Sequence, residues 1–288
     1  MIVVTGAGGK TGQAVVAALA ARGAAVRALV RRSEQGPAFL AHGAQEIAVG
    51  DMRLEADLRR ALAGARSVYH IGPNVHPEEQ AIGLNALAAA IAAGVEHFVY
   101  HSVLHSQTET MPHHWRKLRV EEALLASGLA YTILQPAPYM QNILAGWSAI
   151  LTRGVYAVPY PVSTRLSLVD LLDVAEAAAL VLTQPGHSAA TYEIVGTRAL
   201  SQTEVASSLS EALGRPIVAS AEPVETWEKR ARAGGLDGER VATLRQMFDY
   251  YARFGLAGSP NVLAWLLGRP PTPFQAFVAR TAEAMVAP

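Results

Sequence analysis

The sequence predicts an α/β protein whose doubly wound, parallel β-sheet is covered by helices on both faces. Short runs rich in β-branched residues alternate with helical patterns along the first half of the 288-residue chain. Repeated β–α–β units of this kind require parallel strands, because each helix carries the chain back across the sheet. The runs also lack polar–apolar alternation, as in Ser67–Ile71, which is typical of strands buried on both faces.

The order of elements in the first half follows from these patterns. The expected strands are Ile2–Thr5, Ala25–Val30, Gln45–Val49, Ser67–Ile71, His97–Ser102 and Tyr131–Gln135. The expected helices between them are Gly12–Ala21, Gln35–His42, Glu55–Ala63, Glu79–Ala93 and Trp115–Ala126. Gly64, Gly94 and Gly128 lie just after helical patterns, where glycine commonly ends a helix.

The pattern changes after Gln135, where prolines interrupt the chain at positions 136, 138, 159 and 161. Asp173 is suited to cap the Ala-rich helix that follows it. Thr191–Val195 is expected to be a late strand. From Ser201 onward the chain is mostly helical in pattern, so this tail is not expected to extend the sheet.

Composition excludes several classes of protein. Lys and Arg number 24 and Asp and Glu also number 24, without a basic block, so the chain lacks the electrostatic footprint of a nucleic-acid-binding protein. The absence of cysteine excludes disulfides, thiolate chemistry and Cys-ligated zinc. No apolar run reaches about 18 residues, so no membrane span is expected and a cytoplasmic location is the default.

A glycine-rich loop follows the first expected strand and leads directly into an Ala/Val-rich helix. Such a loop lets a pyrophosphate approach the backbone at a helix N-terminus, where the helix dipole favours an anion. The alternative is a tight turn in another kind of α/β protein. The strand–loop–helix context favours a dinucleotide, with contacts predicted from Gly6, Gly8, Gly9, Lys10, Thr11 and Gly12.

The end of the second expected strand indicates which dinucleotide is bound. Arg31 lies about 20 residues after Gly12, where an acidic residue would select NAD and an arginine would pair with the 2′-phosphate of NADP. Arg31 and Arg32 therefore predict NADP(H) in preference to NAD(H), unless they only form a solvated strand end. One of the two could instead stack on the adenine.

Asp51 and Met52 follow the third expected strand. The Asp51 carboxylate is placed either to meet the adenine amino group or to cap the next helix, and the sequence favours neither role over the other. Both residues are included in the predicted cofactor site.

Three residues near later strand ends are candidates for catalysis. Ser102 ends the fifth expected strand, and Lys117 is expected to begin the helix that follows. The lysine can bond a nicotinamide ribose and add positive charge beside a developing oxyanion. Many such folds place a Tyr four residues before this lysine as a proton donor, and here that position is His113. Its imidazole is either a general acid or an ordinary surface group at a helix start.

Five histidines crowd the stretch from residue 97 to 114, but they do not predict a metal. His97 and His101 lie at even spacing on one strand, and no HExxH or similar ligand spacing is present. A metal site is therefore not expected.

Four segments together resemble the NmrA-like family of atypical short-chain dehydrogenase/reductases. They are Thr5–Gly12, Val99–His105, Lys117–Ala123 and Leu134–Asn142. The resemblance covers the whole chain, and the C-terminal segments Gly258–Gly268 and Pro270–Phe277 look like the tail of its bacterial members. The glycine loop alone is shared by many families, whereas the four segments in this order are specific.

The resemblance implies a Rossmann-type, NADP-preferring domain at residues 1–142, with a late strand contributed by about 165–196. It implies a mostly helical substrate-binding region at 143–288. Further cofactor contacts are implied from Gly72, Pro73, Ser102, Val103, Lys117, Pro136, Tyr139 and Met140. Asn142 and Trp147 are implied to face the substrate pocket.

The family divides between enzymes and regulators. Some members look like NAD(P)H:quinone, azo-dye or triphenylmethane reductases, and others resemble sensors that bind NADP(H) and control a protein partner without chemistry. His113 in place of tyrosine disfavours carbonyl reduction by a Tyr/Lys pair. It disfavours quinone reduction less, because solvent can protonate the reduced product. We therefore expect an NADPH-dependent reductase of a quinone-like or dye-like small molecule. An NADP(H) sensor and an idle scaffold are the alternatives, and the sequence leaves the oligomeric state open.

Overall fold

The computed structural model describes residues 1–286 and divides the chain into two compact units. Unit 1 comprises Met1–Glu109, His113–Pro136 and Val174–Glu193. Unit 2 comprises Thr110–Pro112, Ala137–Asp173 and the chain from Ile194 onward. Each unit is described below by itself.

Unit 1 is built on a seven-stranded sheet, which confirms the predicted fold class. The strand order is β3-β2-β1-β4-β5-β6-β9, and the strands from β1 to β6 pair in parallel with their neighbours. Their bounds are β1 (Ile2–Val4), β2 (Val26–Val30), β3 (Glu46–Val49), β4 (Ser67–His70), β5 (His97–His101), β6 (Ala130–Pro136) and β9 (Ala190–Ile194). The chain order reverses between β1 and β4, which is where ligands bind in open α/β sheets.

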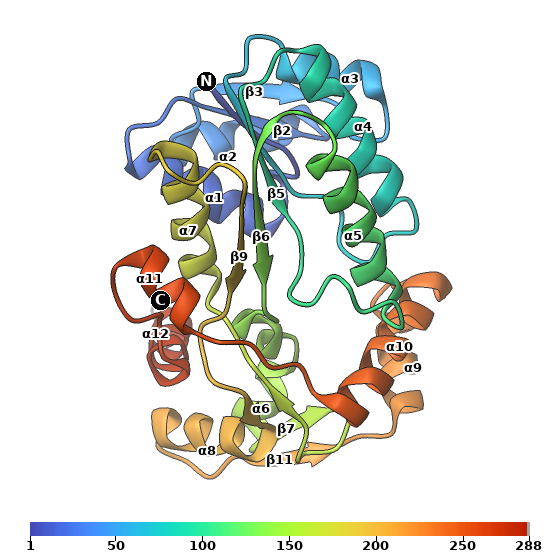
Figure 1. Ribbon diagram of the computed structural model, residues 1–288. Helices are drawn as coiled ribbons and strands as arrows, with labels where there is room; N and C mark the ends of the chain where they lie inside the picture. Colours follow the sequence, from blue (N-terminus) through green and yellow to red (C-terminus); the bar gives the residue numbers. More distant parts are fainter. Residues whose placement is uncertain (287–288) are drawn as a thin grey trace. The chain divides into compact units, whose positions relative to one another are not determined.

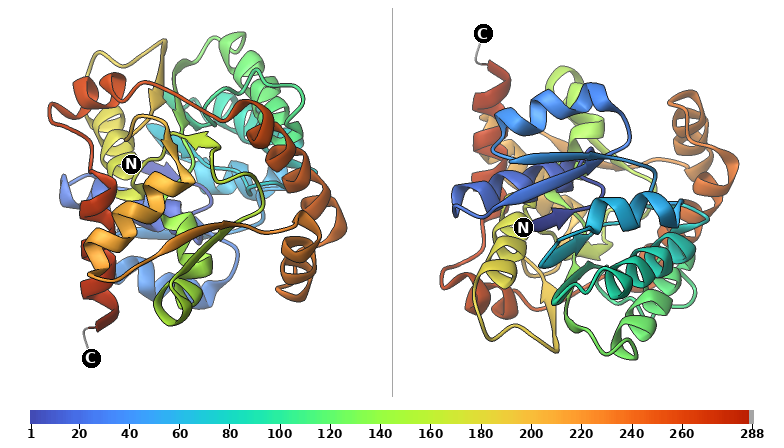
Figure 2. Two further views of the ribbon diagram at one scale, coloured as in Figure 1. Left: turned by 90° about the horizontal axis from the view of Figure 1, so that it is seen from below. Right: turned by 90° about the horizontal axis from the view of Figure 1, so that it is seen from above.

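Helices cover both faces of this sheet (Figures 1 and 2). One face carries α3 (Glu55–Leu62), α4 (Glu79–Ala92) and α5 (Pro112–Leu125). The other face carries α1 (Lys10–Ala21), α2 (Gly36–Ala41) and α7 (Leu171–Thr183). A short 3-10 helix, η1 (Ser33–Gln35), precedes α2.

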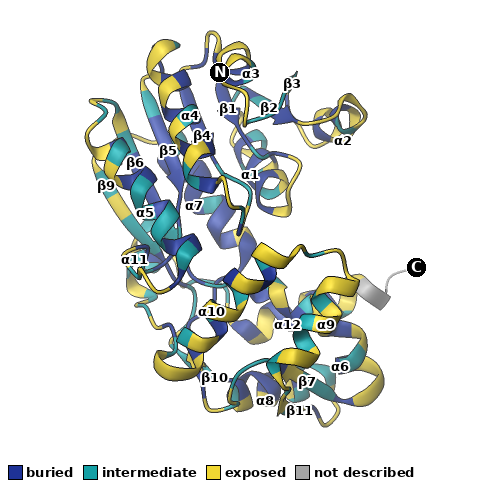
Figure 3. Ribbon diagram, turned by 90° about the vertical axis from the view of Figure 1, so that its right-hand side faces the viewer, coloured by how far each residue is buried: buried dark blue, intermediate teal, exposed yellow. Residues whose placement is uncertain are grey.

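The strands are the most buried part of unit 1 (Figure 3). Every residue of β1 and β4 is buried, including the polar Ser67 and His70 of β4. Between the sheet and α3, α4 and α5 lies a hydrophobic cluster that includes Val68, Phe98 and Val120. Gly83 on α4 lets α5 come close, because a Cβ there would lie 2.5 Å from Val120 Cγ2.

Unit 2 combines helices with two small sheets. β11 (Val218–Ala221) pairs in parallel with β7 (Val155–Val158), and β10 (Leu200–Ser201) pairs antiparallel with β8 (Arg165–Leu166). Its helices are η2 (Met140–Gly146), α6 (Trp147–Arg153), α8 (Gln202–Leu213), α9 (Val224–Ala233), α10 (Gly238–Phe254), α11 (Asn261–Leu267) and α12 (Phe274–Val286). The tail after Ser201 is mostly helical, as predicted, although it also contributes β11, which the sequence did not indicate.

The prediction that Asp173 caps the Ala-rich helix was wrong. Helix α7 begins at Leu171, so Asp173 lies inside its first turn. Asp170 stands before the helix instead and accepts the Leu172 N–H at 3.1 Å. The fully buried Asp173 carboxylate accepts hydrogen bonds from the Arg269 guanidinium at 2.7 Å and from the Thr272 N–H at 2.6 Å. The sequence pattern allows either Asp170 or Asp173 to cap the helix. In the structure, Asp173 instead binds Arg269 and Thr272 of the C-terminal segment.

Within residues 1–286, none of the helices combines the length and the apolar character needed to cross a membrane.

Candidate cofactor and active site

The glycine loop after β1 is held by close backbone contacts. Gly6 has a positive φ of 59°, and a Cβ on it would lie 2.5 Å from the Ile71 carbonyl oxygen. A Cβ on Gly12 would lie 2.5 Å from the Gly6 oxygen and 2.6 Å from the Ala7 Cα. Glycine is required at both positions because the neighbouring atoms are backbone and cannot rotate away.

The loop presents the start of α1 without a side-chain cap. Gly9 is the N-cap residue, and it makes no side-chain cap hydrogen bond. Gly8, Gly9 and Lys10 are exposed, and the Gly9 N–H donates to the Gly6 oxygen at 3.1 Å, which closes the turn. An uncapped helix N-terminus beside exposed glycines fits a pyrophosphate, since the N–H groups and the helix dipole both favour an anion.

A buried threonine joins this loop to the end of β4. Thr5 Oγ1 lies 2.9 Å from His70 Nδ1 and accepts the Ile71 N–H at 3.1 Å. These bonds tie the ends of β1 and β4 together at the reversal point of the sheet. Gly72 and Pro73, predicted to contact the cofactor, continue from this point and are partly exposed.

Arg31 and Arg32 are exposed at the end of β2. Neither guanidinium forms an ion pair among the described residues, so both are free for a phosphate. Gln35 links this strand end to the glycine loop. Its Oε1 accepts the Arg32 N–H at 3.2 Å, and its Nε2 lies 2.8 Å from the point that a Cβ on Gly8 would take.

Asp51 is engaged by Arg53. Its carboxylate accepts the Arg53 N–H at 3.0 Å and pairs with the Arg53 guanidinium at 2.6 Å. These bonds, with smaller contributions from the charges of Arg53 and Arg31, lower the pKa of Asp51 to about 2. Met52 is partly buried and packs against the hydrophobic cluster under α3 and α4.

Ser102, directly after β5, belongs to a buried network around Glu121. The Glu121 carboxylate on α5 accepts hydrogen bonds from the Ser102 hydroxyl, from the Ser106 hydroxyl at 3.1 Å and from Gln135 Nε2 at 3.0 Å. The Ser102 hydroxyl is therefore oriented by the carboxylate one turn beyond Lys117. Val103 follows Ser102 and is partly exposed.

Lys117 forms a buried ion pair with Glu79 of α4. Nζ lies 2.5 Å from Glu79 Oε1, and the side chains are 6% and 1% exposed. Helix α5 begins at Pro112, so Lys117 lies in its second turn and not at its start. Burial raises the pKa of Glu79, and the neighbouring Lys117 charge and hydrogen bond oppose that shift.

His113 lies in the first turn of α5 and is 4% exposed. Its ring meets His114 edge-on at a centroid distance of 4.5 Å, and its Nδ1 is buried without a hydrogen-bond partner in the part of the chain that the structure describes. Burial, with smaller contributions from His114 and Lys117, lowers the pKa of His113 to about 2. The imidazole is consequently neutral near pH 7 and does not carry the extra proton of an imidazolium acid.

Residues 1–286 contain no group of three or more His, Asp or Glu side chains arranged to hold a metal ion.

The remaining predicted site residues fall in both units. Pro136 closes β6 in unit 1, whereas Tyr139, Met140, Asn142 and Trp147 belong to unit 2. Asn142 is exposed, and Met140 is fully buried. Trp147 is 4% exposed, and its indole N–H lacks a hydrogen-bond partner among the described residues.

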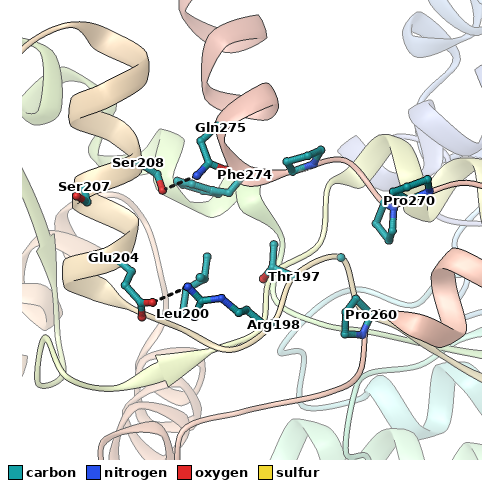
Figure 4. Close-up of a pocket in the computed structure, with 13 residues that line it drawn as sticks. Thr197, Arg198, Leu200, Glu204, Ser207, Ser208, Pro260, Pro270, Phe274 and Gln275 are labelled. Carbon is teal, nitrogen blue, oxygen red and sulfur yellow. Dashed lines mark hydrogen bonds and ion pairs between the residues drawn. The ribbon is translucent and has the colours of Figure 1, made fainter.

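Unit 2 also contains a pocket of about 520 Å³ (Figure 4). Prolines and Phe274 form much of its wall, and its polar groups pair with one another. The Arg198 guanidinium lies 2.7 Å from Glu204 Oε1, and Gln275 Nε2 donates to Ser208 Oγ at 3.2 Å. Neither Asn142 nor Trp147 lines this pocket.

A family model described as the NmrA-like family matches residues 1–270. The chain belongs to the NmrA-like family. The match confirms the resemblance inferred from the four sequence segments. The Rossmann-like sheet described above is in keeping with it.

Three proteins that are similar to this chain are NAD(P)H-dependent reductases. An NAD(P)H azoreductase from Xenophilus azovorans is 31% identical over 285 residues, which cover 99% of each chain. A crystal structure of an NADPH-dependent quinone oxidoreductase from Escherichia coli complexed with NADPH has a TM-score of 0.84 and 27% identity, with 100% of each chain covered. A triphenylmethane reductase from Citrobacter sp. complexed with NADP(H) has a TM-score of 0.85 and 25% identity, covering 98% of this chain and 100% of that one.

These relatives match nearly the whole chain, and all are oxidoreductases. The predicted class, an NAD(P)H-dependent oxidoreductase, is confirmed at that level.

Several residues of the site were not found by sequence reasoning. Thr5, Gln35, Glu79 and Glu121 each contact a predicted site residue or its neighbour. Glu121 had a usable signal, since it lies one helical turn after Lys117 and so shares its helix face. Glu79 had none, because its partner is on a different helix.

Proposed function

We propose that the protein is an NADPH-dependent reductase that delivers hydride to a quinone-like or conjugated, dye-like small molecule. The glycine loop carries the proposal. Its close contact between Gly6 and Gly12 presents an uncapped helix N-terminus at the reversal point of a parallel sheet. That arrangement fits the pyrophosphate of a dinucleotide.

Preference for NADP(H) rests on the second strand. Arg31 and Arg32 are exposed and bear unpaired guanidinium groups at the position that reads the 2′-substituent of the ribose. Planar guanidinium groups bind phosphate through paired, charge-assisted hydrogen bonds. The 2′-phosphate of NADPH would satisfy both of them.

The nicotinamide end of the site is assigned to Ser102 and Lys117. When bound, the reduced cofactor supplies the hydride. Lys117 uses one of its three N–H groups on Glu79, which leaves two donors for ribose hydroxyls. Ser102, oriented by Glu121, can donate toward a carbonyl oxygen of the acceptor only by leaving that carboxylate.

The neutral state of His113 favours an acceptor that needs no dedicated acid. A reduced quinone or dye takes its proton from solvent, whereas ordinary carbonyl reduction depends on a positioned donor. Residues Tyr139, Met140, Asn142 and Trp147 remain predicted contacts of cofactor and substrate. The azoreductase, quinone oxidoreductase and triphenylmethane reductase that resemble this chain support the same substrate class.

The test is oxidation of NADPH by the purified protein with a panel of benzoquinones, naphthoquinones, azo dyes and triphenylmethane dyes. We expect turnover with at least one acceptor, and His113→Gln should keep kcat within about threefold of the wild type. Tight NADPH binding without turnover of any acceptor would overturn the proposal that the protein is a reductase. It would favour the NADP(H) sensor, which should then change conformation or oligomeric state on binding the cofactor.

A further inference from the structure

We propose that Glu79 is the positioning residue of Lys117, and that it fixes the ammonium group where a nicotinamide ribose would need it. The inference rests on the proposed function, in which Lys117 contacts the cofactor. It assigns a role to a residue on α4 that no sequence motif of the site contains. Glu79 acts through Lys117 and does not itself touch the reacting atoms.

The geometry of the pair is that of a dedicated contact. Lys117 Nζ and Glu79 Oε1 are 2.5 Å apart, and both residues are at least nine-tenths buried. Neither Glu79 oxygen has a further hydrogen-bond partner among the described residues. The carboxylate therefore has Lys117 as its principal partner, and no other carboxylate of the described residues forms an ion pair with the ammonium.

The packing of α4 against α5 sets this geometry. Gly83 lies one turn after Glu79, and a Cβ at Gly83 would lie 2.5 Å from Val120 Cγ2. Val120 in turn lies one turn after Lys117. The glycine therefore lets the two helices approach at the height where the ion pair forms. Glu79 is also in the first turn of α4, where the helix dipole stabilises a carboxylate.

A chain of contacts connects the pair to the glycine loop. Gly72 lies beside Glu79, because a Cβ on it would be 3.9 Å from Glu79 Cγ. Gly72 follows Ile71, whose carbonyl oxygen lies 2.5 Å from the point that a Cβ on Gly6 would take. The Glu79 side chain thus lies beside the loop after β4, which is predicted to line the cofactor.

The charge balance explains why a carboxylate is needed. A lone ammonium at this depth loses its hydration without compensation, and it then gives up its proton more readily or leaves the site. Glu79 supplies the compensating negative charge and holds the ammonium group in place. Other titratable or charged groups interact with one or other member of the pair: His70, His76, Tyr100, His101, His113, His114 and Arg116.

The experiment compares Glu79→Gln, Lys117→Met and the double variant in the full-length protein. Steady-state turnover with NADPH and an accepted quinone gives kcat, the KM for the quinone and the pH profile. We expect Glu79→Gln to lower kcat by about tenfold or more with the KM for the quinone little changed. The kcat profile of Glu79→Gln should also fall at a lower pH on its basic side than the profile of the wild type. Glu78→Gln is the matched control, since this exposed neighbour should leave every value unchanged.

The double variant separates positioning from an independent role. If Glu79 acts through Lys117, Glu79→Gln has no further effect once Lys117 is methionine. Losses that multiply in the double variant would overturn the inference, as would a Glu79→Gln enzyme with wild-type kcat and pH profile. If Glu79→Gln does not fold, Glu79→Asp replaces it. Turnover above that of Lys117→Met, with the pH profile of the wild type, is then the supporting result. An aspartate variant as inactive as Lys117→Met would count against the inference.

Failure of the proposed function remains distinguishable. If the wild type turns over no acceptor, the same variants are compared by their dissociation constants for NADPH, measured by calorimetry. The inference then predicts that Glu79→Gln weakens NADPH binding by about threefold or more when Lys117 is present. In the Lys117→Met background, Glu79→Gln should not change the affinity for NADPH. Equal affinity for wild type and Glu79→Gln would overturn it.

Discussion

The carbonyl oxygen of Gly6 lies 2.5 Å from the point where a Cβ atom on Gly12 would stand. This contact lets the first turn of α1 fold back against the loop that precedes it. It also keeps the first amides of the helix directed at the space that a pyrophosphate would occupy.

Gly12→Ala should therefore damage both the fold and cofactor binding. The added methyl meets backbone atoms that cannot rotate away, so we expect a loss of about 1–3 kcal/mol in the free energy of unfolding. The displaced loop should weaken NADPH binding by about tenfold or more. Urea unfolding and calorimetry measure the two effects.

Gly9→Ala is the control for the stability effect, because the nearest atom to its Cβ would be 3.5 Å away and its φ of −84° suits any residue. A Gly12→Ala protein with wild-type stability and NADPH affinity would show that the loop adapts to the side chain.

Replacing Arg31 and Arg32 with alanine should discriminate between the two cofactors. Loss of charge-assisted bonds to the 2′-phosphate should cost about 1.5–3 kcal/mol for each arginine, or roughly tenfold to a hundredfold in affinity for NADPH. Affinity for NADH should change little. Arg22→Ala, an exposed arginine at the other end of α1, is the control. Equal losses for NADPH and NADH would mean that these arginines do not read the 2′-phosphate.

Buried histidines should make the protein unstable in acid. Burial is the main cause that lowers the pKa of His70 and His101 to about 3, of His113 to about 2 and of His114 to about 4. Since these groups protonate in the unfolded chain near pH 6.5, the unfolded state binds more protons below that pH.

Each such histidine should lower the free energy of unfolding by up to about 1.4 kcal/mol per pH unit between about pH 6.5 and its folded pKa. Glu79 has the opposite sign: its raised pKa means that the folded state takes up that proton first as the pH falls. We expect the histidines to dominate by their number. Urea unfolding at several pH values between about 7 and 5 tests this, and a free energy that stays constant across that range would contradict it.

Asp173→Asn should destabilise unit 2. The buried carboxylate accepts bonds from Arg269 and from both the N–H and the hydroxyl of Thr272. Because hydrogen bonds that involve a charged group are worth about 1.5–3 kcal/mol, a loss of that order is expected even though Arg269 is partly exposed. Thermal unfolding measures it against Asp249→Asn, an exposed aspartate on α10 whose change should be near zero. Equal melting temperatures for the two variants would contradict the role assigned to Asp173.

Much of the fold of unit 1 could be predicted because its signals are local. Each expected strand and helix of the first half lies within a few residues of an observed one, since the apolar periodicity and the glycine ends are encoded in neighbouring residues. Strands β7, β8, β10 and β11 were missed. They are short and partly exposed, and their pairing joins segments far apart in the chain.

Parts of the candidate site could be predicted where a short motif requires a particular backbone conformation or position. The glycine loop and the exposed arginine pair have the geometry that their sequence indicated. The side chains around Ser102 and Lys117 were not predictable in the same way. Their partners, Glu121 and Glu79, were not singled out by any motif, and only one of the two lies on the same helix as Lys117.

The sequence by itself determined the alternation of elements, the conformation of the glycine loop and the family to which the chain belongs. These depend on residues that are adjacent or periodic, so a linear pattern contains the physical requirement. Only the tertiary structure decided the state of the ionisable groups. Whether Lys117 is paired, whether His113 is charged and which aspartate starts α7 depend on burial and on groups brought from other elements. Desolvation and close charge pairing act through space, and the order of residues along the chain does not state them.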